Sequence, residues 1–187
     1  MTTVGAGTGA RFVFLVGPSG SGKTVLGGLL ASSTGLGLID TDDELLVASG
    51  QPSISAIFDE HGVAEFRRRE AELISRLEAR PGRYVVATGG GLATIPGMPG
   101  RLRDLGVSVY LRASLDELWT RLSENAGELA LRPLLRGAGK ARLRQMIVDR
   151  TPAYEASSVI VDTDGRTLED IVTDLVALVS DFDAVPA

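Results

Sequence analysis

The chain has 187 residues, 44% of them apolar, and a net charge of −5, values typical of one globular domain. It contains no cysteine, which excludes disulfides and cysteine-based metal centres. Its single histidine, His61, argues against a Ser-His-Asp triad. The negative charge disfavours a nucleic-acid partner, and no apolar run approaches the roughly 20 residues that cross a bilayer, so we expect a cytoplasmic protein without a membrane partner.

Short apolar runs alternate along the chain with longer segments of helical periodicity. Residues 1–10 are rich in Gly and Thr, and we expect a flexible tail there, ahead of one domain at 11–187. The predicted strands are residues 12–16, 36–39, 84–87, 107–111 and 159–161, and the predicted helices are 23–31, 64–80, 114–122, 143–151 and 168–180. This alternation predicts an α/β fold in which helices cover both faces of a parallel sheet. Such sheets bind ligands beyond the carboxyl ends of their strands.

Several helix ends carry recognisable signals. Ser114 and Glu117 have the spacing of a capping box, in which each side chain accepts a hydrogen bond from the other residue's N–H. Thr167 is the expected N-cap of the last helix, and the helix at 143–151 is expected to stop before Pro152.

Two segments fall outside the alternation. Residues 42–63 form a separate insertion of mostly helical pattern, and residues 123–140 are long and rich in Gly and Ala. A connection of that length is uncommon and predicts a lid.

The first predicted strand leads into a phosphate-binding motif. Residues 17–24 match G-x-x-x-x-G-K-[ST], with a strand before and a helix after. The glycines let consecutive N–H groups face phosphate oxygens, Lys23 reaches the β- and γ-phosphates, and the Thr24 hydroxyl is a ligand for Mg²⁺. Lys23 is one of only two lysines among 19 basic residues, which favours this reading over a chance Gly-rich turn. The expected ATP-binding residues here are Gly17, Ser19, Gly20, Ser21, Gly22, Lys23 and Thr24.

Two carboxylates follow the second strand. Asp40 and Asp42 are two residues apart, so in an extended segment they point the same way at a separation of roughly 6.5 Å. One could hold a metal ion while the other accepts a hydrogen bond from a substrate hydroxyl and takes its proton. The alternative is that Thr41 or Asp42 only caps the next helix.

Arginines and glycines supply further candidates. Arg67 and Glu70 are i,i+3 neighbours, so the carboxylate can fix the guanidinium for a bidentate contact with an anion, whereas Arg68 and Arg69 suit a solvated face. The triple glycine at 89–91 permits close backbone approach to a ligand, although it could be an ordinary turn.

Three more arginines lie near the predicted lid. Arg132 within the lid could stabilise the charge of a transferring phosphoryl group, Arg121 could lie on the face of adenine, and Arg150 ends the helix after the lid. Each of them could instead be a surface arginine.

Taken in order, these motifs resemble those of shikimate kinases. The match runs from residue 12 to about 166 and comprises the phosphate loop, the D-x-D of Asp40 and Asp42, S-I-x-x-I-F at 53–58, F-R-x-x-E at 66–70, the triple glycine, R-P-L-L at 132–135, and Arg150 with Tyr154. The resemblance implies a three-layer P-loop kinase fold with a five-stranded parallel sheet of order 2-3-1-4-5. It also implies a helical substrate-binding segment at about 42–72, a lid at about 123–140, and transfer of the ATP γ-phosphoryl group to the 3-hydroxyl of shikimate.

The resemblance also implies residue roles. Thr24 and Asp40 would serve Mg²⁺, Asp42 would bind the ring hydroxyls and act as base, and Lys23 and Arg132 would act on the phosphates. The implied shikimate-binding residues are Asp42, Arg67, Gly89, Gly90, Gly91 and Arg150, and the implied adenine-flanking residues are Arg121 and Arg166.

The sequence departs from the family pattern in the substrate-binding segment. Leu46 and Val63 stand where acidic residues are usual, and Gln51 and Pro52 mark an insertion of one residue. Two alternatives therefore stay open, a kinase of another small hydroxy acid and a catalytically silent module that senses a ligand. We expect a monomer, since the chain carries no obvious dimerisation motif.

Overall fold

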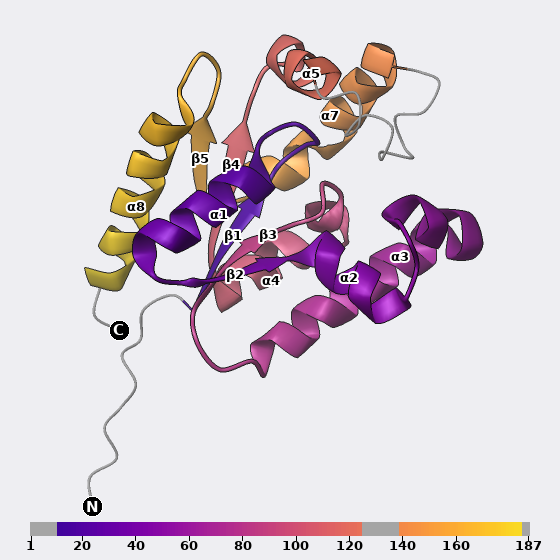
Figure 1. The fold of residues 1–187 in the computed structure, drawn as a ribbon, viewed down its shortest axis with the longest axis horizontal. Coiled ribbons are helices and arrows are strands. Elements are labelled where there is room, and N and C mark those ends of the chain that lie inside the picture. The colour runs from indigo at the N-terminus through magenta and orange to yellow at the C-terminus, as the bar shows by residue number, and fades with distance from the viewer. Residues whose placement is uncertain (1–10, 125–138, 185–187) are drawn as a thin grey trace, which may run out of the picture.

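The computed structural model describes residues 11–124 and 139–184, and their centre is a parallel sheet of order β2-β3-β1-β4-β5 (Figure 1). The strands are β1 (Phe12–Val16), β2 (Gly37–Asp40), β3 (Tyr84–Ala87), β4 (Gly106–Arg112) and β5 (Val159–Asp162). Every residue of β1 is buried because it lies between β3 and β4 with helices on both faces. The predicted strands, their direction and the implied order are confirmed.

Helices cover the sheet on both faces, which gives the three predicted layers. On one face, α1 (Lys23–Thr34) and α8 (Leu168–Ala184) pack against the side chains of Val13, Leu15 and Val85. The opposite face buries Phe12, Phe14 and Val86 against α3 (Ile54–Glu78) and α4 (Met98–Leu105). The remaining helices are α2 (Thr41–Ser49), the short η1 (Leu92–Thr94), α5 (Leu115–Glu124) and α7 (Gly139–Glu155).

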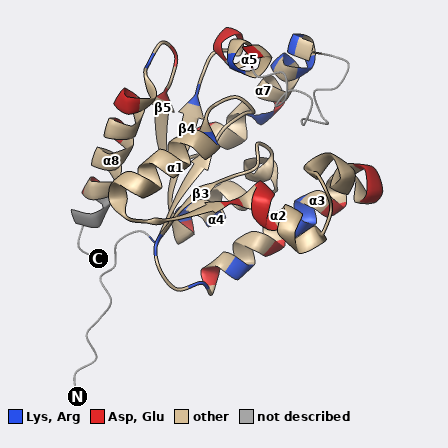
Figure 2. Ribbon diagram, viewed as in Figure 1, with Lys and Arg blue, Asp and Glu red and all other residues tan. Residues whose placement is uncertain are grey.

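The insertion after β2 consists of α2 and the first part of α3. Ser53 caps α3 by accepting a hydrogen bond from the N–H of Ala56 at 3.1 Å. Gly62 breaks the helix with φ 77° and ψ 168°, a conformation that is essentially restricted to glycine. The predicted helix at 64–80 is thus the second half of α3. Figure 2 shows acidic and basic residues interleaved along α3, where Arg68 bridges Glu65 and Glu72 on the exposed side.

Two predictions about helix ends are wrong and one is confirmed. Helix α7 continues through Pro152 to Glu155, because the next turn buries Tyr154 in the core, and this packing outweighs the hydrogen bond that proline cannot donate. At α5, the hydroxyl of Ser114 accepts from the N–H of Glu117 at 3.2 Å, but the reciprocal bond of a capping box is absent, since Asp164 accepts from the N–H of Ser114 at 2.8 Å. Thr167 does cap α8, because its hydroxyl accepts from the N–H of Asp170.

Helix α4 and the turn η1 have no counterpart among the sequence predictions. Helix α4 begins with Met98, Pro99 and Gly100, of which proline and glycine have low helix propensity, yet Met98 and Leu102 are buried against the sheet. Tertiary burial stabilises this helix where its local sequence does not.

The predicted tail at 1–10 and the central part of the predicted lid, 125–138, lie outside the described residues. The ends of the predicted lid belong to α5 and α7, which pack together through Leu118, Leu122 and Leu143. Within the described ranges, no helix is both long and apolar enough to span a membrane.

Candidate active site

The loop between β1 and α1 has a shape that only glycine supports. Gly17, Gly20 and Gly22 have positive φ angles of 147°, 85° and 87°. A side chain at Gly17 would also place its Cβ 2.9 Å from the carbonyl oxygen of Leu111 on the neighbouring strand. Helix α1 then begins at Lys23 without a side-chain cap, so its first N–H groups face the loop. An uncapped helix N-terminus behind a glycine loop is suited to bind phosphate.

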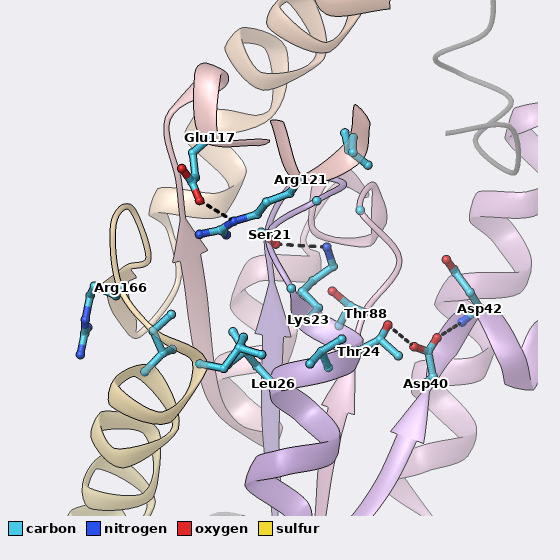
Figure 3. A pocket seen from close by; sticks show the side chains of 17 residues that line it. Ser21, Lys23, Thr24, Leu26, Asp40, Asp42, Thr88, Glu117, Arg121 and Arg166 are labelled. Carbon is cyan, nitrogen blue, oxygen red and sulfur yellow. Dashed lines mark hydrogen bonds and ion pairs between the residues drawn. The ribbon is translucent and has the colours of Figure 1, made fainter. Parts of the chain in front are cut away.

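Lys23 lies across this loop with only 8% of its surface exposed. Its Nζ donates to the carbonyl oxygens of Gly17 at 2.9 Å and Pro18 at 2.8 Å. It also donates to the hydroxyl of Ser21 at 3.4 Å, a bond that Figure 3 shows. The ammonium group is therefore held within the phosphate loop.

Asp40 joins the loop to the end of β2. Its Oδ2 accepts from the hydroxyl of Thr24 at 2.8 Å, and its Oδ1 accepts from the N–H of Asp42 at 2.9 Å, which makes Asp40 the N-cap of α2. The alternative reading, in which Thr41 or Asp42 provides this cap, is therefore wrong. The side chain of Asp42 stays directed toward the glycines after β3, since a Cβ at Gly89 would lie 2.7 Å from its Oδ1.

The oxygens of Thr24 and Asp40 suit a magnesium ion. Mg²⁺ binds hard oxygen ligands and usually takes one or two from the protein and the rest from water and substrate phosphates. In the part of the chain that the structure describes, no cluster of three or more acidic or histidine side chains could hold a metal alone. The residues present therefore fit an ion shared with a bound nucleotide.

These residues line a cavity of about 360 Å³ at the carboxyl ends of the strands. Its wall includes most of the predicted nucleotide site and both carboxylates: Gly20, Ser21, Gly22, Lys23, Thr24, Asp40, Asp42, Gly90, Arg121 and Arg166. The structure thus brings together groups from five separate parts of the sequence.

Arg121 and Arg166 border the far side of this cavity. Arg121 is fixed by the carboxylate of Glu117 at 2.8 Å and donates to the carbonyl oxygen of Thr163 at 2.9 Å, which ties α5 to the loop after β5. Arg166 is paired with Asp174 at 2.7 Å, and Figure 3 shows its side chain at the edge of the cavity, directed away from Lys23.

The triple glycine after β3 lies between several of the predicted residues. The N–H of Gly89 donates to the hydroxyl of Thr41 at 2.8 Å, and a Cβ at Gly90 would lie 3.5 Å from the carbonyl oxygen of Gly17 in the phosphate loop. A Cβ at Gly91 would collide with the guanidinium of Arg67. Gly89 and Gly91 therefore lie in close-packed contacts that exclude a side chain, so the segment is not an ordinary turn.

Arg67 and Glu70 form the expected pair on α3. The Nη1 of Arg67 contacts Oε2 of Glu70, which is completely buried, while Oε1 of Glu70 has no hydrogen-bond partner among the described residues. Burial raises the pKa of Glu70 from 4.5 to about 7, and the adjacent guanidinium only partly opposes this increase. Arg67 is consequently held against Gly91 by a carboxyl group that has no access to water.

Arg150 reaches the same segment from α7, since its Nη1 donates to the carbonyl oxygen of Gly90 at 3.0 Å. The hydroxyl of Tyr154 donates to that same oxygen. Arg132 lies outside the described residues.

Sequence reasoning missed the roles of three threonines at the ends of the strands. Thr41 holds Gly89, Thr88 lines the cavity and donates to the carbonyl oxygen of Leu15 at 2.9 Å, and Thr163 holds Arg121. Each comes within one residue of the end of a strand, which is the signal that could have identified them.

The matching family model and the curated relatives agree on one family. A family model described as shikimate kinase matches residues 19–180. The shikimate kinase of Francisella tularensis subsp. holarctica is 38% identical over 162 residues, which are 86% of this chain and 89% of that relative.

Solved structures of the same family have a similar fold. Shikimate kinase from Acinetobacter baumannii in complex with shikimate has a TM-score of 0.83 and 29% identity, with 94% of this chain and 96% of that chain covered. Shikimate kinase from Bacteroides thetaiotaomicron has a TM-score of 0.80 and 26% identity, with 90% and 98% covered.

The buried carboxyl of Glu70 is expected to make the folded protein less stable as the pH rises. Its pKa is raised to about 7 in the folded state, so the folded protein holds the proton more tightly than the unfolded chain, where the value is 4.5. The resulting stabilisation is complete below the unfolded value and is lost as the pH rises through about 7.

Urea denaturation of the wild type and of Glu70→Gln, which cannot titrate at this position, measures the effect. The unfolding free energy of the wild type, relative to the variant, should fall on the order of 3 kcal/mol between about pH 4.5 and pH 8. If the unfolding free energies of the two proteins changed with pH in the same way, the raised pKa of Glu70 would be refuted.

Proposed function

The chain belongs to the shikimate kinase family, and we infer that it transfers the γ-phosphoryl group of ATP to the 3-hydroxyl of shikimate. The products are shikimate 3-phosphate and ADP, in the chorismate route to aromatic amino acids. The observation that carries this function is the triple glycine, which borders the phosphate loop through Gly90 and contacts both Arg67 and Arg150. These two guanidinium groups form an anion site separate from the phosphate loop, which suits an acceptor that bears a carboxylate.

We assign the binding of ATP to the phosphate loop and the far wall of the cavity. The N–H groups of the loop and the start of α1 would bind the phosphate oxygens, and Lys23 would exchange its contacts with Gly17 and Pro18 for the β- and γ-phosphates. Arg121, held by Glu117 and Thr163, would lie against adenine, with Arg166 at the rim.

A Mg²⁺ ion bound with the nucleotide would neutralise charge on the phosphates during transfer. The hydroxyl of Thr24 is placed to serve it directly. Asp40, which accepts the hydrogen bond of that hydroxyl, would serve it through water.

Asp42 is the proposed base. It lies in the cavity wall beside Gly89 and within the same turn as Asp40, so it can bind the ring hydroxyls of the acceptor. As the 3-hydroxyl oxygen bonds to the γ-phosphorus, the bond from that phosphorus to the β-phosphate oxygen breaks and the hydroxyl proton passes to the Asp42 carboxylate.

The carboxylate of shikimate would bind to Arg67 and Arg150, and the backbone at 89–91 would line the acceptor site. Arg132 of the predicted lid would contact the transferring phosphate, with the lid excluding water. The family match, together with Lys23 and both carboxylates in place, disfavours a catalytically silent sensor.

Other features stay predictions from the sequence. These are the single domain at 11–187, the substrate-binding segment at about 42–72, the lid, the monomeric state, the cytoplasmic location and the absence of nucleic-acid or membrane partners.

The proposed reaction is tested by measuring ADP release with Mg-ATP and different acceptors. Shikimate should support turnover of at least 1 per second, within the usual enzyme range, while quinate, gluconate and no acceptor give only background. Chelation of Mg²⁺ with EDTA should abolish the signal. Faster turnover with another acceptor would refute shikimate as the substrate and retain the assignment as a kinase. No turnover with any acceptor would refute both assignments.

Replacing Arg67 with alanine should weaken the binding of shikimate selectively. Loss of a charge-assisted bidentate contact costs about 2–3 kcal/mol, so the KM for shikimate should rise roughly 30- to 150-fold while the KM for ATP changes less than about threefold. Arg68→Ala is the matched control, because Arg68 lies on the exposed side of the same helix and bridges only Glu65 and Glu72. Equal increases of both KM values in Arg67→Ala would refute the carboxylate role.

Asp42→Asn should separate catalysis from nucleotide binding. The amide cannot accept the hydroxyl proton, so kcat should fall at least about 100-fold, the usual contribution of a general base, with an unchanged Kd for ATP by calorimetry. The neighbouring Asp43→Asn, at an exposed position of α2, is expected to keep normal turnover. Near-normal kcat in Asp42→Asn would rule out its role as base.

A further inference from the structure

One carbonyl oxygen in the active site accepts hydrogen bonds from two side chains of the same helix. The oxygen of Gly90 accepts from Nη1 of Arg150 at 3.0 Å and from the hydroxyl of Tyr154. Arg150 and Tyr154 are four residues apart on α7, which places them on the same face of the helix. Since a carbonyl oxygen has two lone pairs, these two donors fill its capacity.

The two donors differ in how firmly they are held. The side chain of Tyr154 is 1% exposed, and its ring lies 5.2 Å from the ring of Tyr110 in the core. Burial raises the pKa of Tyr154 above its usual value of 10, so the hydroxyl keeps its proton and stays a donor. Arg150 is only partly buried. The tyrosine is the fixed donor of the pair and the arginine is the one that can be redirected.

The position of Gly90 gives this shared contact its importance. Gly90 packs against the phosphate loop, where a Cβ would lie 3.5 Å from the carbonyl oxygen of Gly17, and its neighbour Gly91 packs against the guanidinium of Arg67. The direction of the Gly90 carbonyl therefore fixes the peptide segment between the two proposed anion sites.

We propose that Tyr154 is a positioning residue, which keeps the Gly90 carbonyl hydrogen-bonded when Arg150 turns from it to the carboxylate of the acceptor. This inference rests on the proposed function for the role of Arg150 alone. A carboxylate is a stronger acceptor for guanidinium than a carbonyl oxygen is, so the substrate draws Arg150 away. Without the tyrosine hydroxyl, that movement would leave a carbonyl oxygen without a partner, and Arg150 would be retained at Gly90 in competition with the substrate.

The variant Tyr154→Phe tests the proposal, because it removes only the hydroxyl and keeps the ring and its packing. The KM for shikimate should rise about five- to tenfold, while kcat and the KM for ATP stay within about twofold of the wild type. A purely structural role would lower Tm and the active fraction, and hence kcat, without changing the KM for shikimate.

Tyr110→Phe is the matched control. It makes the same change in the other ring of the pair, and among the described residues the Tyr110 hydroxyl forms no hydrogen bond. Its kinetics should equal those of the wild type.

A double substitution shows whether Tyr154 acts through Arg150. In an Arg150→Lys background, Tyr154→Phe should raise the KM for shikimate by less than about twofold, because the contact that it protects is already changed. A full five- to tenfold increase in that background would overturn the proposed route.

The outcomes also separate this proposal from the function on which it rests. Normal shikimate turnover by the wild type, with equal KM values for Tyr154→Phe and Tyr110→Phe, would overturn the role of Tyr154 alone. No shikimate-dependent turnover by the wild type would overturn both.

Discussion

The close packing of three consecutive glycines is the constraint on which the rest of the site depends. Gly89 faces Asp42 and Glu70, Gly90 faces the phosphate loop, and Gly91 faces the guanidinium of Arg67. At Gly89 and Gly91 a Cβ would displace a neighbour, whereas at Gly90 it would lie in ordinary contact with the phosphate loop. Because the segment has no side chains, its backbone can lie within contact distance of both the nucleotide pocket and the proposed acceptor pocket.

The parallel sheet explains why these parts meet. In a parallel sheet the carboxyl ends of all strands lie at one edge, and here β1, β2 and β3 end at the phosphate loop, at Asp40 and at the glycines. The register pairs Leu15 and Asp40 with the same residue of β3, Ala87, so the three strands end at nearly the same height. Gly20 and Gly90, which are 70 positions apart in sequence, therefore reach one cavity.

Features encoded in local patterns could be predicted from the sequence. The strands at 12–16 and 84–87 coincide with β1 and β3, because continuous apolar runs bounded by glycine or proline suit a fully buried strand. The phosphate loop, the two carboxylates and the Arg67–Glu70 pair were likewise visible as short motifs.

The features that could not be predicted depend on contacts between distant residues. The bond from Ser114 to Asp164 replaces half of a local capping box, and the burial of Tyr154 carries α7 through a proline. The threonines that hold Gly89 and Arg121 have no motif of their own, since their partners are 48 and 42 residues away. Pattern reasoning has no access to such pairs until the topology is known.

The contacts of Lys23 have a consequence for how tightly a nucleotide can bind. Its Nζ donates to Gly17, Pro18 and Ser21, so an incoming phosphate must compete with these loop oxygens for the ammonium group. Binding exchanges hydrogen bonds to neutral oxygens for charge-assisted hydrogen bonds to phosphate, and only the difference between them adds to affinity. The net gain from Lys23 is consequently smaller than that of an ammonium group without partners in the chain.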